Sequence, residues 1–264
     1  MNKEEVIVTT FNTAQVQLTA TQRVYTGRRA AEAILEEVTL LGATRVFLLV
    51  SSTLNTRTDE IKQISDALGD RVAAVYDGIL PHVPRTCVLK AAAAARKVNA
   101  DLIVTVGGGS VTDAGKLIPL ALKYNWLEHD DLEPYRVYVD DAGETVMPVF
   151  DAPDIRIVCC PTTLSGGEFY FLAGATDETV GHKQGYAHLQ MAPVSIILDP
   201  ELTLHTPKWL WTSTGVRSLD HALETLGSFQ SSIFCDAMAD GGLRHLYKAL
   251  PEVHANPGNL EARL

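Results

Sequence analysis

The stretch Asp101-Leu-Ile-Val-Thr-Val-Gly-Gly-Gly-Ser-Val-Thr-Asp-Ala-Gly-Lys116 combines a strand pattern, a glycine turn and a helix start. Its apolar run over 102–106 is typical of a strand that is covered on both faces. Three consecutive glycines follow this run: Gly107, Gly108 and Gly109. Because glycine has no Cβ, these residues can take positive φ and let a ligand lie directly on the backbone. Ser110 is placed to cap the next helix, with Asp113 in its first turn.

The start of that helix predicts a site for an anion. Its free N–H groups and the helix dipole both favour negative charge, most simply a phosphate. The spacing is neither G-x-G-x-x-G nor G-x-x-x-x-G-K-[ST], so neither nucleotide fingerprint is present. A glycine turn that only connects strand to helix is the alternative. We favour the phosphate site, because the three glycines directly follow a buried strand.

Strand and helix patterns alternate along the residues before this stretch. We expect helices over 28–41, 58–68 and 84–98, and strands over 45–50 and 71–76. This alternation predicts an α/β domain with a parallel, Rossmann-like sheet and helices on both faces. Ligands of such sheets bind beyond the carboxyl ends of the strands.

The two flanks of the α/β pattern are less regular. Near the N-terminus, β-prone segments over 6–10, 16–18 and 23–25 predict a hairpin or an edge strand. Residues 124–154 are polar, and their turn signals predict a surface excursion.

Beyond the glycine turn, we expect further strands over 155–160, 169–173 and 194–198. Two helices follow over 210–226 and 233–250, and Pro251 should end the second. The sequence therefore predicts an α/β domain over 1–199 and a partial, all-helical domain over 200–264.

The composition of the 264 residues is that of a globular protein, with 46% hydrophobic and 20% charged residues. The net charge of −10 argues against nucleic acid as a partner, because no basic stripe is present to neutralise phosphates. Four scattered cysteines show neither a disulfide framework nor metal spacing, which favours the cytoplasm. We expect no membrane span and no signal peptide.

Ser51 stands where an acidic residue normally binds the ribose hydroxyls of NAD, at the end of an early strand. Without an acidic side chain, repulsion against a 2′-phosphate is removed, and Arg57 follows a few residues later. This favours NADPH, or acceptance of both NADH and NADPH. The alternative is that Ser51 only caps the next helix.

A second loop of hydroxyls and glycines, Pro161-Thr-Thr-Leu-Ser-Gly-Gly-Glu168, follows the strand over 155–160. Alone, such a loop is more often a plain turn. Beside the glycine turn of the central stretch, it indicates a ligand-binding edge.

Five segments together resemble the iron-containing alcohol dehydrogenase family, which includes the maleylacetate reductases. They are Pro81-His-Val-Pro84, Gly107 to Lys116, Pro161 to Glu168, Asp199-Pro-Glu-Leu-Thr203 and Gly215 to Glu224. The resemblance implies an NAD(P)-dependent dehydrogenase or reductase, and it extends from about residue 20 to Leu264.

The resemblance also implies roles for single residues. In the family, the glycine loop holds the pyrophosphate of NAD(P), and the second loop lies along the nicotinamide and its phosphates. This implies cofactor contacts for Thr162, Thr163 and Ser165, and a place near the cofactor for His82. Lys183 stands at the place of a family lysine near the nicotinamide end; a solvated surface lysine is the alternative.

The helix over 215–224 departs from the family pattern. The family carries Asp-x-x-x-His there, which places two metal ligands one turn apart. His221 matches the histidine, but Arg217 stands at the place of the aspartate. A guanidinium cannot ligate a divalent cation and repels it. Two further family histidines lie on helices beyond residue 264, so we predict no bound metal.

Arg217 and His221 suggest another chemistry at this position. Arg217 could bind a substrate carboxylate or stabilise a developing alkoxide. This agrees with the maleylacetate reductases, whose substrates are oxo-dicarboxylic acids and some of which need no metal. His221 could act as a general acid. A packed or capping pair without a catalytic role is the alternative.

Three hypotheses follow for the function. The first is an NAD(P)-dependent reductase of a carbonyl compound or oxo-acid, which the five segments favour. The second is a non-redox enzyme on the same scaffold, such as a lyase, dehydratase or cyclase. The third is a non-catalytic binding protein whose uncovered helices form a homodimer. Family members continue past Leu264 with more helices, so the chain is either a fragment or a naturally short relative.

Overall fold

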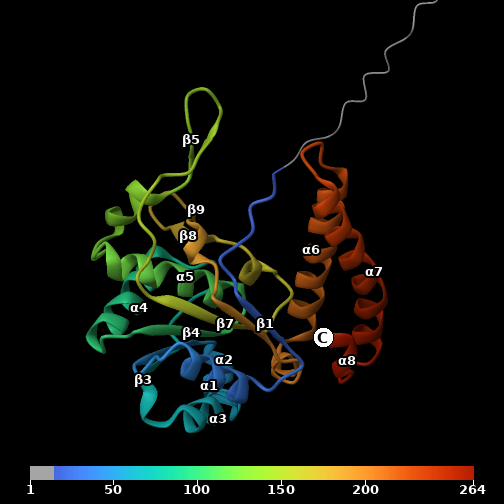
Figure 1. Cartoon of the computed structure of the whole chain (residues 1–264), viewed down its shortest axis with the longest axis horizontal. Helices are drawn as coiled ribbons and strands as arrows, with labels where there is room; N and C mark the ends of the chain where they lie inside the picture. The colour runs from blue at the N-terminus through green and yellow to red at the C-terminus, as the bar shows by residue number, and fades with distance from the viewer. Residues whose placement is uncertain (1–14) are drawn as a thin grey trace, which may run out of the picture.

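The computed structural model describes residues 15–264 as a parallel sheet with helices on both faces, followed by a helical layer (Figure 1). The strand order is β1-β10-β7-β4-β2-β3, and every neighbouring pair is parallel. The strands are β1 (Arg23–Thr26), β2 (Val46–Val50), β3 (Val72–Tyr76), β4 (Leu102–Gly107), β7 (Arg156–Pro161) and β10 (Ser195–Leu198). The predicted α/β, Rossmann-like sheet is confirmed.

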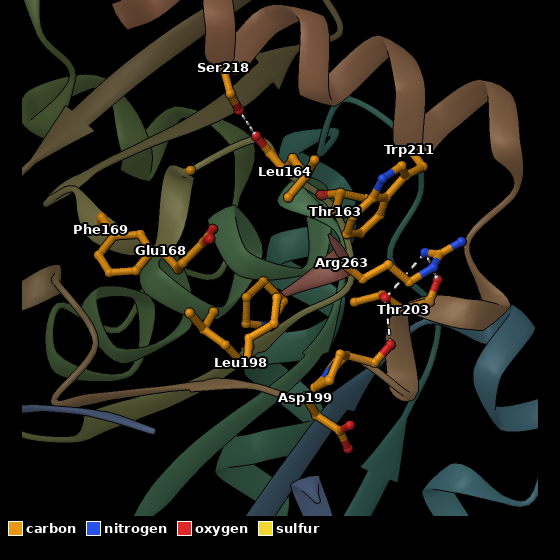
Figure 2. A pocket seen from close by; sticks show the side chains of 14 residues that line it. Thr163, Leu164, Glu168, Phe169, Leu198, Asp199, Thr203, Trp211, Ser218 and Arg263 are labelled. Carbon is orange, nitrogen blue, oxygen red and sulfur yellow. Dashed lines mark hydrogen bonds between the residues drawn. The ribbon is translucent and has the colours of Figure 1, made fainter. Parts of the chain in front are cut away.

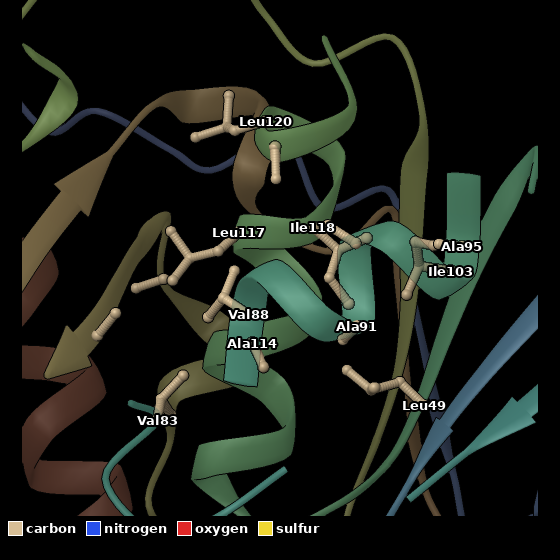
Figure 3. Packing of buried hydrophobic residues seen from close by; sticks show 14 of the residues in the cluster. Leu49, Val83, Val88, Ala91, Ala95, Ile103, Ala114, Leu117, Ile118 and Leu120 are labelled. Carbon is tan, nitrogen blue, oxygen red and sulfur yellow. The ribbon is translucent and has the colours of Figure 1, made fainter. Parts of the chain in front are cut away.

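Four helices cover the faces of this sheet: α1 (Ala30–Leu40), α3 (Glu60–Leu68), α4 (Arg85–Lys97) and α5 (Gly109–Lys123). The alternation of side chains along β2 explains the two layers. Val46, Leu48 and Val50 belong to one buried cluster, with residues of α1 and α3. Phe47 and Leu49 belong to the other, with residues of α4 and α5 (Figure 3). Because both faces are buried, the strand reads as a continuous apolar run.

A short helix, α2 (Ser52–Arg57), directly follows β2. Ser51 is the N-cap residue of α2, but its side chain makes no capping hydrogen bond. Gly42 follows α1 with φ of +65°, as expected for a glycine that ends a helix.

The N-terminal prediction is only partly testable. Residues 6–10 lie outside the described residues, and 16–18 form no strand. Residues 23–25 lie in β1, which pairs parallel with β10 and so is an edge strand rather than half of a hairpin. The partner comes from the far end of the domain, which local sequence does not reveal.

Two antiparallel hairpins are added to the main sheet. One is formed by β5 (Tyr138–Val139) and β6 (Thr145–Val146), within the predicted excursion, which also contains the 3-10 helix η2 (His129–Tyr135). The other is formed by β8 (Leu172–Asp177) and β9 (His182–Ala187).

The strand predicted over 169–173 was wrong. A 3-10 helix, η3 (Gly167–Phe169), occupies the start of that segment, and β8 begins at Leu172. β9 was not predicted at all, because its sequence His-Lys-Gln-Gly-Tyr-Ala has no β-branched residue.

The helical layer consists of α6 (Lys208–Gly227), α7 (Ile233–Ala255) and the short α8 (Leu260–Arg263). The predicted end of the second helix at Pro251 was wrong, because α7 continues to Ala255. Proline removes one helical hydrogen bond, at a cost of roughly 3 kcal/mol. Val253, which is buried in the next turn, offsets part of that cost. The division of the chain at residue 199 stays a prediction. No helix in the described part of the chain is both long and apolar enough to cross a membrane.

Gly115 allows α5 to lie directly against β4. A Cβ at Gly115 would lie 2.1 Å from Cγ2 of Thr105, a buried residue of β4. We expect Gly115→Ala to lower the free energy of unfolding by about 1–3 kcal/mol, because the added methyl group overpacks this contact. Gly242→Ala in α7 is the matched control, since no atom lies within 4 Å of its added Cβ. It should stabilise α7 by up to about 1 kcal/mol. Equal effects of the two changes in urea unfolding would contradict the close contact.

Candidate active site

The carboxyl ends of three neighbouring strands bring the predicted nucleotide-binding loops together. Ser51 follows β2, β4 ends at the first of the three glycines, and Thr162 follows β7. The Ser51 N–H donates to the carbonyl of Val106 at 2.8 Å, and the Thr162 N–H donates to the carbonyl of Gly107 at 3.0 Å. The parallel register therefore places the three loops side by side at one edge of the sheet.

The glycine loop has little room for side chains. A Cβ on Gly107 would lie 2.8 Å from Cγ2 of Val111 in α5, and a Cβ on any of the three glycines would also approach a neighbouring loop more closely than most Cβ atoms do. The contacts would join Gly107 to Ser51 Cβ at 3.3 Å, Gly108 to Thr163 Cγ2 at 3.2 Å and Gly109 to Ser165 Oγ at 3.0 Å. The loop is thus a bare backbone surface bordered by hydroxyl side chains.

Two details of the predicted loop were wrong. None of the three glycines has positive φ; Gly108, for example, has φ of −79°. The N-cap residue of α5 is Gly108 and not Ser110, which lies within the first turn. Glycine is required here for the close approach of the flanking loops, and not for a left-handed backbone. Gly108 has no side chain with which to cap α5.

The loop that carries His82 reaches the same helix start. The His82 N–H donates to Ser110 Oγ at 3.3 Å, and its carbonyl accepts from the Thr176 hydroxyl at 2.7 Å. His82 and Val83 have φ of +64° and +56°, which is unfavourable for both residue types. The surrounding contacts hold this strained loop between α5 and β8, as is common at binding sites.

A hollow of about 680 Å³ opens between the second loop and α6. Asp113 of α5 and Ser165 of the loop form part of its wall, together with Tyr170. His221 and Glu224 of α6 also line this hollow. The structure therefore brings three predicted site residues, Asp113, Ser165 and His221, to one cleft.

Lys183 lies on β9 and is joined to the same cleft. Its Nζ donates to Asp113 Oδ2 at 2.9 Å, and about half of its side chain is exposed. Its stem packs over Gly174 of β8, where a Cβ would lie 2.2 Å from Lys183 Cε. Lys183 is therefore held by Asp113 and Gly174 and is not a freely solvated surface lysine.

The Arg217 guanidinium pairs with carboxylates of its own helix. Its Nη1 donates to the Asp220 carboxylate and lies 3.8 Å from Glu224 Oε2, and Arg217 is not among the residues that line the cleft. These carboxylates thus hold the guanidinium, and one of them, Glu224, lines the cleft. A carboxylate-binding role would require the guanidinium to leave Asp220.

The residues at this position do not fit a metal centre. Arg217 stands four residues before His221 on α6, and a guanidinium has no lone pair for a cation. Within residues 15–264, no group of three or more His, Cys, Asp or Glu side chains is close enough to hold a metal ion.

Lys116 and Glu168 were part of the quoted motifs but were not predicted as site residues. Both are buried directly behind the cleft wall. Burial lowers the pKa of Lys116 and raises that of Glu168. A lysine between Gly115 and Leu117, on the apolar face of a predicted helix, was the available signal.

A smaller cavity of about 210 Å³ lies on the other side of the second loop (Figure 2). Its wall includes Leu164, Glu168 and Trp211, and most of it is apolar. Residues 107–109 line neither hollow. The larger cleft, unlike the smaller cavity, is lined by Asp113, Ser165 and His221, so it is the candidate active site.

A polar cluster of Arg85, His129, Glu133 and Asp177 lies between the His82 loop and the β8–β9 hairpin. Arg85 is fully buried; its guanidinium contacts Glu133 and lies 3.5 Å from Asp177 Oδ2. His129 Nε2 lies 3.1 Å from Asp177 Oδ1. A hydrogen bond from the Thr179 hydroxyl, aided by Arg85 and His129, lowers the pKa of Asp177 to about 2.

The low pKa of Asp177 predicts a pH dependence of stability. A carboxyl group whose pKa is lower when folded stabilises the protein above its unfolded pKa of about 4. That contribution is lost as the pH falls from about 4 to about 2. Asp177→Asn should therefore unfold more easily than the wild type at pH 7, with the difference shrinking at pH 3. Asp130→Asn, an exposed neighbour of His129, is the control and should change little. A pH-independent difference in urea unfolding would contradict this assignment.

Comparisons with known proteins agree with this architecture. The model of the iron-containing alcohol dehydrogenase family matches residues 21–200. The chain is 34% identical to the dehydrogenase ALT3 of Alternaria alternata, over 77% of this chain and 52% of that protein. It is 31% identical to a maleylacetate reductase of Burkholderia cepacia, over 91% of this chain and 58% of that protein.

Solved structures show the same fold. The sulfoacetaldehyde reductase of Bifidobacterium kashiwanohense, in complex with NAD+, has a TM-score of 0.82 at 26% identity, covering 96% of this chain and 64% of that one. Maleylacetate reductase from Agrobacterium tumefaciens has a TM-score of 0.76 at 26% identity, with 96% and 62% covered. The chain spans about half to three fifths of the length of these curated relatives. The matched family model, the shared fold and the glycine loop at the sheet edge together show that the chain belongs to the iron-containing alcohol dehydrogenase family.

Proposed function

We propose that this chain is an NAD(P)-dependent oxidoreductase that reduces a carbonyl compound or an oxo-acid. The observation that carries the proposal is the side-chain-free glycine loop at the start of α5, bordered by Ser51, Thr163 and Ser165. Such a loop lets a diphosphate approach the backbone N–H groups at the positive end of the helix dipole.

The residues at the sheet edge fit a dinucleotide. The N–H groups at the start of α5 would bind the pyrophosphate, with Thr162 and Thr163 beside it. Ser51 would face the adenosine ribose; its side chain makes no capping bond in α2 and is free for a ligand. Because Ser51 is uncharged, we propose NADPH, or both cofactors, as the nucleotide. When bound, the nicotinamide supplies or accepts the hydride.

The proton would come from this chain's own side chains. His221 lines the cleft from α6, opposite Ser165 and Asp113, and we assign it the role of general acid to the carbonyl oxygen. Lys183, held by Asp113 beside the cleft, would stabilise negative charge on that oxygen. Because Arg217 replaces an acidic ligand, we propose that no metal takes part in this step.

The substrate we infer is a small molecule, and the charges of the cleft restrict its class. Asp113 and Glu224 line the cleft, whereas Arg217 is paired with Asp220. Binding of an oxo-acid would therefore depend on Lys183, the cation that lies beside the cleft. An uncharged carbonyl compound would need only the hydroxyl groups and His221.

The assembly and compartment are also proposals. We propose a homodimer, because α6, α7 and their connection expose large apolar side chains, among them Trp209, Phe229 and Ile233. We propose the cytoplasm, since all four cysteines are free thiols and burial raises the pKa values of Cys159 and Cys160.

Nucleotide binding is the direct test. We expect calorimetric titration with NADPH and with NADH to show dissociation constants of about 1 μM to 1 mM, the usual range for substrates. Gly108→Ala should weaken binding at least about tenfold, because its Cβ fills the space beside Thr163. Gly241→Ala in α7 is the control, since no atom lies within 4 Å of its added Cβ. Absence of binding by the wild type would overturn the proposal and favour a non-redox or purely structural role.

The role of His221 can be tested separately. With NADPH and a panel of aldehydes and oxo-acids, His221→Asn should lower kcat by about 10²- to 10⁴-fold, while the nucleotide affinity stays unchanged. His245→Asn in α7 is the matched control, because His245 does not line this cleft. A variant that retains full kcat would remove His221 from the mechanism.

A further inference from the structure

Lys116 is a fully buried charged residue for which the proposed mechanism gives no role. It lies on α5, one turn after Asp113, and its side chain is completely excluded from solvent. Its Nζ donates to the backbone carbonyls of Gly167 and Leu172, the latter at 2.9 Å. A buried ammonium is unfavourable unless hydrogen bonds and nearby charge compensate it. An apolar residue would fill this core position at a lower cost.

The two carbonyls belong to the segment that forms one wall of the cleft. Ser165, Gly167, Tyr170 and Leu172 all line the cleft, opposite His221 on α6. At the near end of this segment, Ser165 Oγ comes within 3.0 Å of the position that a Cβ of Gly109 would take. A shift of the wall away from α5 would therefore separate Ser165 from the nucleotide edge.

The far end of the same segment leads to Lys183. Leu172 begins β8, and Gly174 of β8 supports the stem of Lys183. Lys183 in turn binds Asp113, on the helix that also carries Lys116. Helix α5 thus holds the hairpin at two points, one buried and one half exposed.

Glu168 is a second buried ionisable group on this wall. The residue is 4% exposed, and within residues 15–264 its Oε2 has no hydrogen-bond partner. Figure 2 shows the carboxyl group on the side of the segment that faces the smaller cavity. Burial raises the pKa of Glu168, and the charge of Lys116 acts in the opposite direction. Both charges therefore lie behind the cleft wall and not in the cleft.

We propose that Lys116 is a positioning residue, which fixes the wall over 165–172 against α5 and thereby places Ser165, Tyr170 and Lys183 for the reaction. The proposal rests on the proposed function for its catalytic consequence. Its structural part, the attachment of the wall, does not require turnover.

Lys116→Met tests the proposal, because methionine fills a similar volume without donating to the two carbonyls. We expect amide hydrogen exchange over residues 165–174 to accelerate at least about tenfold, while exchange in β2 and β4 stays unchanged. The kcat should fall by about 10²-fold, and the affinity for NADPH should change less than about threefold. Lys123→Met is the matched control on the same helix, since Lys123 pairs only with the exposed Asp154.

The outcomes separate this inference from the proposed function. Unchanged exchange over 165–174 in Lys116→Met would overturn the positioning role, whether or not the wild type binds nucleotide. Failure of the wild type to bind NADPH would overturn the proposed function and leave the exchange result valid. If Lys116→Met does not fold, Lys116→Gln replaces it: the shorter side chain should lose at least one of the two carbonyl contacts and accelerate exchange over 165–174, and an unaltered pattern would overturn the proposal.

Discussion

The parallel pairing of β4 with both β2 and β7 is the constraint on which the site depends. It places the glycine loop between Ser51 and Thr163, so close that a Cβ at positions 107 to 109 would be crowded. A sheet packed on both faces cannot move these loops independently, because each strand is held by two apolar layers. The rigid edge therefore presents bare backbone and hydroxyl groups to a ligand without any rearrangement.

Buried charges extend this rigidity from the sheet to the walls of the cleft. Arg85 and its carboxylate partners hold the His82 loop and the β8–β9 hairpin. Lys116 holds the segment that faces α6. Removing one partner of such a buried group leaves the other without compensation, so these contacts allow few alternative positions. The apolar core gives stability, whereas these polar contacts define where the site residues stand.

The resemblance to the family implies that His221 stands at one position of a metal-ligand pair and that Arg217 stands at the other. In the structure, Arg217 pairs with Asp220 along the surface of α6. The charge at this end is thereby reversed, which disfavours a divalent cation. We propose that His221 and Lys183, the latter held by Asp113, carry the polar part of the chemistry instead.

The sequence alone determined the parallel sheet, the glycine loop and the family, because buried strands, glycine runs and motif spacing are local properties of residues such as 102–116. It did not reveal β9, because that strand has no β-branched residue. It also did not reveal the edge pairing of β1 with β10 or the continuation of α7 through Pro251, since these depend on packing against distant parts of the chain. Only the tertiary structure placed His221 at the cleft, whereas Arg217 pairs locally with Asp220, three residues along the same helix. The spacing of residues along a helix predicts which face of that helix each side chain is on. Which other part of the protein lies against that face depends on the tertiary structure.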